Sequence, residues 1–240
     1  KLYGLQFALT DEVEKYHQEV QTYKVTDAEG NYVALLYTDF FPRAGKRNGA
    51  WMTTFKDQYV DLQGNDSRPH ISIVCNFTRP TDTEPSLLTF NELTTLFHEF
   101  GHALHGMLSR VTYPSLSGTN VARDFVELPS QLMENWCYEE ETLLLFATHY
   151  QTGAPLPIEW VQKIKEASAF MEGILSVRQL NFGFLDMAWH TYPHLERLEN
   201  GHLFEQEATK ETQLYPPIDV MCISPAFSHI FSGGYAAGYY

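Results

Sequence analysis

The sequence has few cysteines and few basic residues, and both deficits restrict the functions it can have. Its three cysteines, Cys75, Cys137 and Cys222, are far apart and form no Cys-x-x-Cys pair. This pattern indicates neither a disulfide framework nor a thiolate zinc site, so a reducing, cytoplasmic compartment is expected. Its 16 Lys and Arg residues face 30 Asp and Glu residues, which gives a net charge of −14. Because nucleic acids and anionic membranes are bound by clustered cations, we expect neither as a partner.

Long apolar runs are also lacking. No stretch approaches the roughly 20 apolar residues of a membrane span, and the N-terminus shows no secretory signal. The chain begins at Lys1 instead of a methionine, and it ends at Tyr240 directly after a glycine-rich run. We therefore expect a monomeric fragment of a longer protein.

The first part of the chain, residues 1–88, carries the patterns of a small sheet. Residues 19–41 are rich in Val, Tyr and Thr and are interrupted by a turn at Ala28-Glu29-Gly30-Asn31, which predicts a β-hairpin. Residues 71–77 predict a third strand, and the polar residues 43–49 predict a loop. A small N-terminal β-sheet is the expected result.

The second part, residues 89–240, carries helical patterns. Thr89 and Glu92 form a capping box ahead of apolar residues at helical spacing, so a helix is predicted there. A second helix is predicted from Glu127 to about His149. Further helix is predicted from Pro157 to about His190, and a stripe of apolar residues at helical spacing is predicted to face the core. The stripe consists of Val161, Ile164, Met171, Ile174 and Leu175. We predict an α+β fold, mainly α-helical, in which residues 1–240 form part of a single domain.

The first predicted helix contains the sequence His98-Glu99-x-x-His102. Residues four apart lie about 6 Å apart along a helix and roughly 40° apart around it, so both imidazoles can face one zinc ion. Glu99 flanks the same face, where its carboxylate can take a proton from a metal-bound water. This arrangement is typical of a metallopeptidase, in which one zinc ion per chain lowers the pKa of the water that attacks a peptide carbonyl.

The motif also has a simpler interpretation. It has three fixed residues, and it would arise in roughly a few per cent of shuffled sequences of this composition. A structural protein that carries the motif by accident is therefore an alternative hypothesis.

A catalytic zinc ion usually has a third protein ligand, and three residues are candidates. His105 lies on the face of His98, but roughly 10 Å further along the helix, which is too far for both to reach one ion. Asp124 and Glu127 lie just before or at the start of the second predicted helix. Spacing alone does not choose between these two carboxylates.

Several spaced segments carry a resemblance to a known family. They are His98-Glu99-Phe100-Gly101-His102-Ala103-Leu104-His105, Ser117-Gly118-Thr119, Asp124-Phe125-Val126-Glu127-Leu128-Pro129-Ser130-Gln131, and Glu134-Asn135-Trp136. With them the chain resembles the thimet oligopeptidase family of zinc metallopeptidases, which includes oligopeptidase A and the bacterial peptidyl-dipeptidases. The resemblance implies a zincin-like catalytic domain and makes Glu127 the third zinc ligand. Asp39-Phe40-Phe41-Pro42-Arg43 with Lys46-Arg47 and Gly49-Ala50-Trp51-Met52 leans toward the peptidyl-dipeptidase branch.

The resemblance extends to the C-terminal segment, Phe227-Ser228-His229 and Ser232-Gly233-Gly234-Tyr235-Ala236-Ala237-Gly238-Tyr239-Tyr240. In the family, His and Tyr side chains here hydrogen-bond the substrate and the developing oxyanion. This implies that Tyr239 and His229 are oxyanion or substrate donors and that Tyr235 contacts the substrate. The family has a further catalytic tyrosine just beyond the position of Tyr240, and a large helical region that would precede Lys1.

The resulting hypothesis is a zinc metallopeptidase that acts on short peptides. His98, His102 and Glu127 hold the zinc ion, Glu99 is the base, and release of C-terminal dipeptides is favoured. Cleavage of internal bonds in oligopeptides is the alternative within the same chemistry. A catalytically silent peptide-binding fragment is the alternative from another class.

Overall fold

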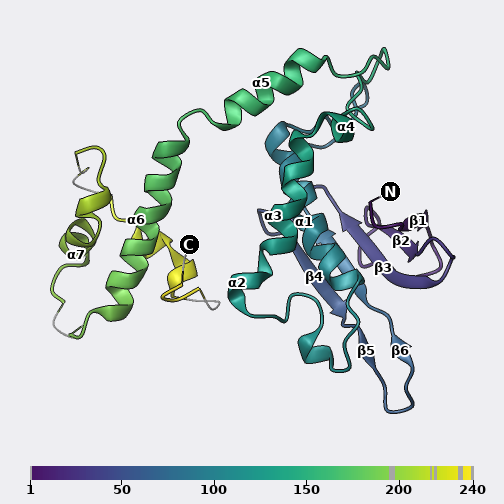
Figure 1. Ribbon diagram of the computed structural model, residues 1–240, viewed down its shortest axis with the longest axis horizontal. Helices are drawn as coiled ribbons and strands as arrows, with labels where there is room; N and C mark the ends of the chain where they lie inside the picture. The colour runs from purple at the N-terminus through teal and green to yellow at the C-terminus, as the bar shows by residue number, and fades with distance from the viewer. Residues whose placement is uncertain (1, 195–197, 217, 219–220, 232–234, 239–240) are drawn as a thin grey trace. The chain divides into compact units, whose positions relative to one another are not determined.

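The computed structural model describes residues 2–194, 198–216, 218, 221–231 and 235–238. The chain divides into two compact units, residues 1–162 and 163–240, and each is described by itself. The strands of the described residues all lie between Gln6 and Val74, and helices dominate from Phe90 onward, so the fold is α+β (Figure 1). Among the described helices, none combines the length and the apolar character that a membrane span requires.

A five-stranded sheet forms one layer of the first unit. Its order is β1-β2-β3-β7-β4, in which β3 and β7 are parallel and the other neighbouring pairs are antiparallel. The strands are β1 (Gln6–Leu9), β2 (Gln21–Thr26), β3 (Tyr32–Asp39), β4 (Trp51–Lys56) and β7 (His70–Val74). The predicted hairpin is confirmed by β2 and β3, and the predicted third strand by β7.

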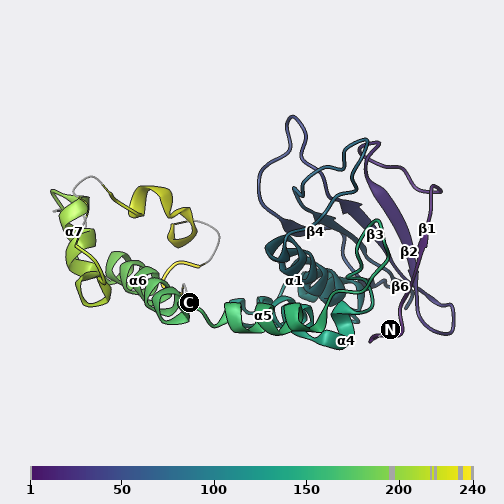
Figure 2. The same cartoon turned by 90° about the horizontal axis from the view of Figure 1, so that it is seen from above.

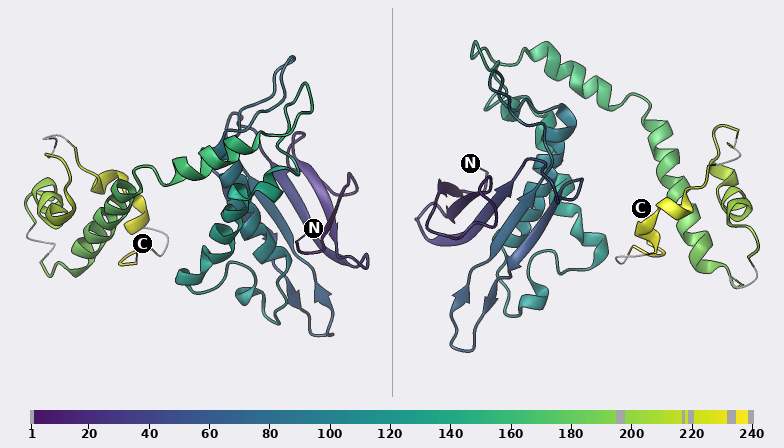
Figure 3. Two further views of the ribbon diagram at one scale, coloured as in Figure 1. Left: turned by 45° about the horizontal axis from the view of Figure 1, so that its top comes forward. Right: turned by 180° about the vertical axis from the view of Figure 1, so that it is seen from behind.

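The sequence did not reveal β1, β4 or the small hairpin of β5 (Tyr59–Val60) and β6 (Asp66–Ser67), which extends beyond the sheet (Figure 3). These strands are two to six residues long and carry weak alternation, as in the Trp51-Met52-Thr53-Thr54 run of β4. Strands this short form because the sheet supplies their hydrogen-bond partners, a long-range effect that local propensity does not contain.

Side chains of β3 alternate between two apolar layers. Ala34 and Leu36 belong to the main core, together with Ile71 and Ile73 of β7. Leu35 and Tyr37 face the opposite side, where they pack with Val20. Because both faces of this central strand are covered, nearly all of its residues are buried.

Helix α1 (Phe90–Met107) lies along one face of the sheet and contacts β7, β4 and β3 (Figures 1 and 2). The predicted capping box is present: Thr89 accepts a hydrogen bond from the Glu92 backbone, and the Glu92 side chain accepts one from the Thr89 backbone. Gly106 allows the close packing of α1 on β7, because a Cβ at this position would lie 2.7 Å from Cδ1 of Ile71. The helix is therefore fixed at its start by the cap and near its end by the sheet.

Helix α3 (Leu128–Glu134) packs beside α1, and the approach is closest at Gly101. A Cβ on Gly101 would lie 2.5 Å from both the carbonyl oxygen of Pro129 and the Cα of Ser130. The backbones of the two helices are therefore in direct contact, and a residue with a side chain at position 101 would force them apart.

The single helix predicted from Glu127 to about His149 is wrong beyond the end of α3. A 3₁₀ turn, Asn135–Tyr138, follows α3, and Glu139 then adopts an extended conformation with φ −91° and ψ 127°. Only the short α4 (Glu140–Leu143) resumes helical geometry. The extended residue interrupts the ladder of backbone hydrogen bonds, which the apolar pattern does not disclose.

The chain passes from the first unit to the second within α5 (Ile158–Ser168), and the second unit contains α6 (Glu172–Thr191) and α7 (Gly201–Ala208). The continuous helix predicted from Pro157 to His190 is interrupted, because Met171 has left-handed geometry with φ 59°. The predicted core stripe is also wrong in part. Val161 is buried, but Met171 and Leu175 are exposed in the described structure.

The core of the second unit is small. Leu185 of α6 packs with Phe227 and Ile230 of the C-terminal segment, and Trp189 lies at its edge. The C-terminal segment lies beside α6 and has only short 3₁₀ turns among its described residues, Ser224–Ala226 and Ser228–Ile230 (Figure 3). Its position therefore depends on side-chain contacts instead of a regular backbone ladder.

We expect Gly101→Ala to lower the free energy of unfolding by at least about 2 kcal/mol, because the added methyl group meets backbone atoms that cannot rotate away. Gly173→Ala is the matched control, since a Cβ at this helical position meets nothing within 4 Å. Alanine there should be neutral or should stabilise by about 0.5–1 kcal/mol. Urea unfolding of both variants measures the difference, and equal stabilities would contradict the close approach.

Candidate functional site

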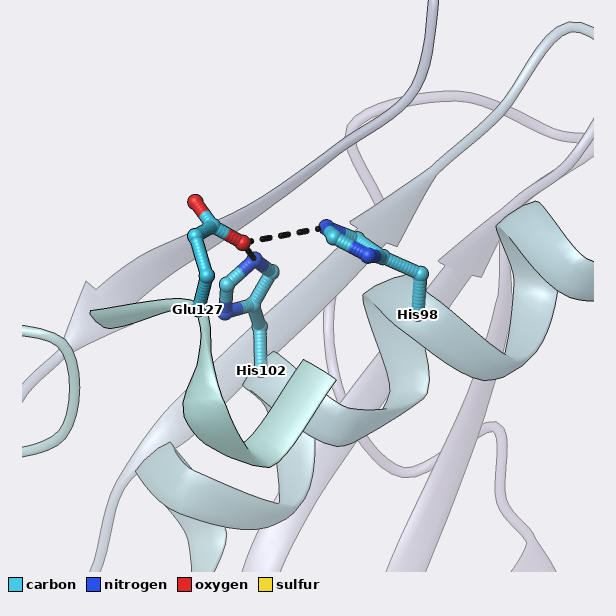
Figure 4. A group of neighbouring side chains, drawn as sticks. All are labelled: His98, His102 and Glu127. Carbon is cyan, nitrogen blue, oxygen red and sulfur yellow. Dashed lines mark ion pairs between the residues drawn. The ribbon is translucent and has the colours of Figure 1, made fainter. Parts of the chain in front are cut away.

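Three side chains that are distant in sequence converge between α1 and α3. His98 and His102 project from α1, and Glu127 projects from the residue that precedes α3 (Figure 4). Each offers one ligand atom, and the three atoms lie within 4.8 Å of one another. Oε2 of Glu127 is 3.3 Å from Nε2 of His98 and 3.1 Å from Nε2 of His102. The group has the composition and spacing of a metal site.

The position of Glu127 follows from the local backbone. It forms the C-cap of α2 (Arg123–Val126) and the N-cap of α3, so it lies at a corner between two helices. The Ser130 hydroxyl donates to the Glu127 backbone oxygen at 2.9 Å and lies 2.8 Å from Oε2. Ser130 is also the residue whose Cα faces Gly101. The helix contact and the orientation of the carboxylate therefore share one residue.

A second carboxylate fixes the orientation of His98. Oε1 of Glu134, the last residue of α3, lies 2.6 Å from Nδ1 of His98. A proton on Nδ1 leaves the lone pair of Nε2 directed at Glu127. Without a cation, this arrangement would bring the nitrogen lone pair against a carboxylate oxygen. The pairing therefore favours a positive ion between the ligand atoms.

The distances fit a four-coordinate metal ion. Nitrogen and oxygen ligands at about 2.0–2.1 Å from one ion in tetrahedral geometry are about 3.3 Å from each other. The two nitrogen–oxygen separations, 3.3 and 3.1 Å, agree with this value, and the three ligand atoms together lie within 4.8 Å of one another. The residues present therefore fit a divalent metal ion.

The two histidines have opposite pKa shifts. Burial lowers the pKa of His102, and the nearby Glu127 carboxylate offsets this only in part. Burial also tends to lower the pKa of His98, but the hydrogen bond with Glu134 and the surrounding carboxylates outweigh it, so the pKa is raised. Since neutral imidazole is the form that binds metals, the pKa shift of His102 favours metal binding and the pKa shift of His98 opposes it.

Glu99 is buried beside this group but is not one of its ligands. Burial raises the pKa of its carboxyl group, and the nearby Glu127 raises it further, although the Met52 backbone hydrogen bond and His98 act in the opposite direction. Its Oε2 has no hydrogen-bond partner among the described residues. A buried carboxylate with a raised pKa and an unused oxygen is suited to accept and release a proton.

The ligands and Glu99 line a cleft of about 520 Å³ in the first unit. Residues 50–52, at the start of edge strand β4, form one wall, and residues between 119 and 127 form the other. Arg123 is among the residues that line the cleft on this side. The cleft is large enough to receive several residues of an extended peptide.

The structure separates the other candidates for a third ligand. Asp124 precedes Glu127 by three residues, but it is exposed and is not part of the three-residue group. His105 is also outside the group, and its ring contacts that of Phe125, with centroids 6.1 Å apart. Burial lowers the pKa of His105, in agreement with a packing role.

The C-terminal residues singled out from the sequence belong to the second unit. His229 is exposed, and the half-buried Tyr235 lies against it with ring centroids 6.4 Å apart. Tyr239 lies outside the described residues. His229 and Tyr235 are thus neighbours, while their proposed action at the metal site stays a prediction.

Sequence reasoning assigned no role to Glu134, Ser130 or Gly101. Glu134 lies seven residues after Glu127, and this helical spacing places the two carboxylates on the same side of α3. That spacing was a usable signal for Glu134. The roles of Ser130 and Gly101 depend on the contact between two helices and have no comparable local pattern.

Comparison with known proteins gives a consistent result. The model of peptidase family M3 matches residues 1–240. The chain is 42% identical over 241 residues to the dipeptidyl carboxypeptidase of Escherichia coli (strain K12). This alignment covers 100% of this chain and 35% of that protein. It is 39% identical over 243 residues to oligopeptidase A of Salmonella typhimurium (strain LT2), with the same coverage of 100% and 35%.

A plant relative is equally similar. The chain is 42% identical over 245 residues to the probable cytosolic oligopeptidase A of Arabidopsis thaliana, which covers 100% of this chain and 35% of the relative. The chain thus spans about a third of the length of these relatives.

We expect Glu134→Ala to weaken binding of a divalent metal ion by roughly 10–100-fold, because His98 loses the carboxylate that fixes its ring and its tautomer. Glu134→Gln, which keeps a hydrogen-bond acceptor, should have a smaller effect. Glu141→Ala, on α4 and outside the group, should leave the affinity unchanged. Competition of each protein with a chromogenic chelator for Zn²⁺ measures the affinities, and equal values for Glu134→Ala and Glu141→Ala would contradict this role.

Proposed function

Because this chain belongs to peptidase family M3, we propose that it is the catalytic part of a zinc metallopeptidase that hydrolyses short peptides. The observation that carries the proposal is the convergence of His98, His102 and Glu127 beside the buried carboxylate of Glu99. A zincin-like catalytic domain, to which residues 1–240 contribute as one functional part, belongs to the same proposal.

The proposed roles follow from the chemistry of each group. His98, His102 and Glu127 would hold one zinc ion, which supplies Lewis-acid chemistry by lowering the pKa of water and polarising a peptide carbonyl. Glu99 accepts the proton that the attacking water releases and then donates it to the leaving amine. Burial supports this cycle, since the raised pKa of Glu99 brings proton uptake closer to neutral pH.

Strand β4 would orient the substrate. It is an edge strand, and its first residues form a wall of the cleft beside Glu99. An extended peptide could add to this edge through backbone hydrogen bonds, which recognise any sequence and hold the scissile carbonyl at a fixed depth. Recognition through the backbone is consistent with a peptidase that accepts many short peptides.

The C-terminal segment completes the proposal. His229 and Tyr239 would donate hydrogen bonds to the substrate or to the oxyanion, and Tyr235 would contact the substrate. Loss of one such donor typically costs about 3–4 kcal/mol of transition-state stabilisation. The ring contact between His229 and Tyr235 supports a joint role, because it gathers two donor side chains at one place in the second unit.

For the cleavage mode, we favour release of C-terminal dipeptides over cleavage of internal bonds. A dipeptidyl carboxypeptidase and an oligopeptidase A both match the chain, so these relatives do not choose between the two cleavage modes. The preference depends on the residues that line the cleft. Among the described residues that line the cleft, Arg123 alone carries a guanidinium group. This group binds carboxylates through paired hydrogen bonds, as capture of a free C-terminus requires.

The remaining expectations belong to the same proposal. A monomeric enzyme in the cytoplasm, with peptides as its partners and neither nucleic acid nor membrane, agrees with the net charge of −14 and with a cytosolic relative. A catalytically silent peptide-binding protein is the competing function, and it would retain zinc and peptide without cleavage.

We expect Glu99→Gln in the longer protein to reduce kcat by roughly 10²–10⁴-fold, because the amide cannot accept a proton from water. Zinc should remain bound near one ion per chain, since Glu99 is not among the ligand atoms. Peptide cleavage followed by mass spectrometry and metal analysis of the same sample measure both properties. Unchanged turnover would exclude Glu99 as the base, and wild-type protein with zinc but no turnover would favour the silent binding protein.

We expect the longer protein to release a dipeptide from a short peptide with a free C-terminus and to cleave the amidated form at least about tenfold more slowly, because the amide removes the charge that pairs with Arg123. Arg123→Gln should raise KM for the free-acid peptide and leave KM for the amidated peptide unchanged. Equal cleavage of both peptides by the wild type would assign the protein to internal cleavage.

A further inference from the structure

The turn formed by residues 235–238 depends on a buried carboxylate of α6. The backbone carbonyl of Tyr235 accepts a hydrogen bond from the backbone N–H of Gly238 at 3.0 Å, and this bond closes the turn. Asp186, which is fully buried, accepts the N–H of Ala237 through Oδ1 and that of Gly238 through Oδ2, each at 2.8 Å. Both oxygens of one carboxylate therefore bind consecutive backbone amides of the turn.

The turn needs this support because its backbone is strained. Ala237 has φ 53°, which lies in the left-handed region that residues with a Cβ rarely adopt. Residues hold such geometry when surrounding contacts determine it. The hydrogen bonds to Asp186 fall on this residue and on the next one. Nδ1 of His190, one helical turn further along α6, also lies 2.9 Å from Oδ1 of Asp186.

The turn begins with Tyr235, whose ring contacts His229. The other end of the same C-terminal segment is fixed in a similar way. Glu205 of α7 is buried and accepts the backbone N–H of Ile223 at 2.7 Å and that of Ser224 at 2.9 Å. Two buried carboxylates thus hold the segment, one ahead of His229 and one after Tyr235.

We infer that Asp186 is a positioning residue: by holding the turn 235–238 it places the Tyr235 phenol beside His229 for contact with the peptide substrate. The inference rests on the proposed function, because it assumes that Tyr235 contacts the substrate. Asp186 itself is buried, so it acts through the turn and does not touch the peptide. Within the second unit, substrate contact is therefore governed by α6 as well as by the C-terminal segment.

The substitution Asp186→Asn tests this directly in the longer protein. Asparagine keeps the shape, but its NH₂ group is a donor and would face one of the two backbone N–H groups, so the turn loses one anchor. Glu207→Gln is the matched control, because it makes the same chemical change at an exposed carboxylate of α7 that pairs with Lys210. We expect Asp186→Asn to raise KM for a short peptide by about tenfold with a smaller change in kcat, and Glu207→Gln to leave both near wild type.

A double-mutant cycle with Tyr235→Phe identifies the route. If Asp186 acts through the Tyr235 phenol, Asp186→Asn adds little to KM in the Tyr235→Phe background, so the combined effect is well below the product of the single effects. Multiplicative effects, or an equal rise in KM for Glu207→Gln, would assign Asp186 a merely structural role and overturn the inference.

The two proposals fail in different ways. If Tyr235→Phe leaves KM and kcat unchanged, the proposed role of Tyr235 is wrong and the inference falls with it. If Tyr235→Phe impairs binding and Asp186→Asn does not, the inference alone is overturned.

Hydrogen exchange on the wild-type protein keeps the inference open to test if Asp186→Asn does not fold. The amides of Ala237 and Gly238 should exchange more slowly than in the denatured chain, since both are bound by a buried carboxylate. Exchange at the denatured rate would overturn the inference.

Discussion

The contact between α1 and α3 at Gly101 is the constraint on which the site depends. The ligands come from two helices, and their separation is set by how closely the helix backbones approach. Glycine removes the one atom that would keep them apart, since a Cβ there would lie 2.5 Å from the α3 backbone. Ser130, at the point of contact, also binds the Glu127 carboxylate. A change in this contact would therefore move the third ligand relative to the two histidines.

Charge gives a second reason why these residues belong together. Glu99, Glu127 and Glu134 surround the two imidazoles, and their proximity would be unfavourable without positive charge. The surrounding carboxylates raise the pKa of His98, and burial beside Glu127 raises the pKa of Glu99, so both shifts favour binding of a proton in the site. A divalent cation meets the same requirement without those protons. The electrostatics of the site thus lead to the same conclusion as its distances.

Local sequence predicted those parts of the site that lie within one element. Spacing along α1 was enough for His98, Glu99 and His102, and the capping box located the start of the helix. The choice between Asp124 and Glu127 was not local, because it depends on which side of α3 faces α1. The resemblance to a known family made that choice, and the structure brings the Glu127 carboxylate to the histidines.

The wrong predictions of secondary structure and burial also concern features that local sequence does not contain. Met171 and Leu175 were expected to be buried because apolar residues recur there at helical spacing, but left-handed geometry at Met171 separates α5 from α6, and both side chains are exposed in the described structure. Periodicity reports which residues share a face, and it does not report whether that face has a partner. The edge strand β4 illustrates the reverse case, since its weak pattern becomes a strand because β7 supplies its hydrogen bonds.

The two units support their functional residues by different means. The proposed metal ligands and Glu99 lie within residues 1–162, on or beside helices that are packed against a sheet. His229 and Tyr235 lie in a segment that has only short turns among its described residues, and buried carboxylates hold it. Metal geometry tolerates errors of a few tenths of an ångström, which a packed helix pair can guarantee. A segment held by a few hydrogen bonds can adjust its position more easily than a helix pair packed against a sheet.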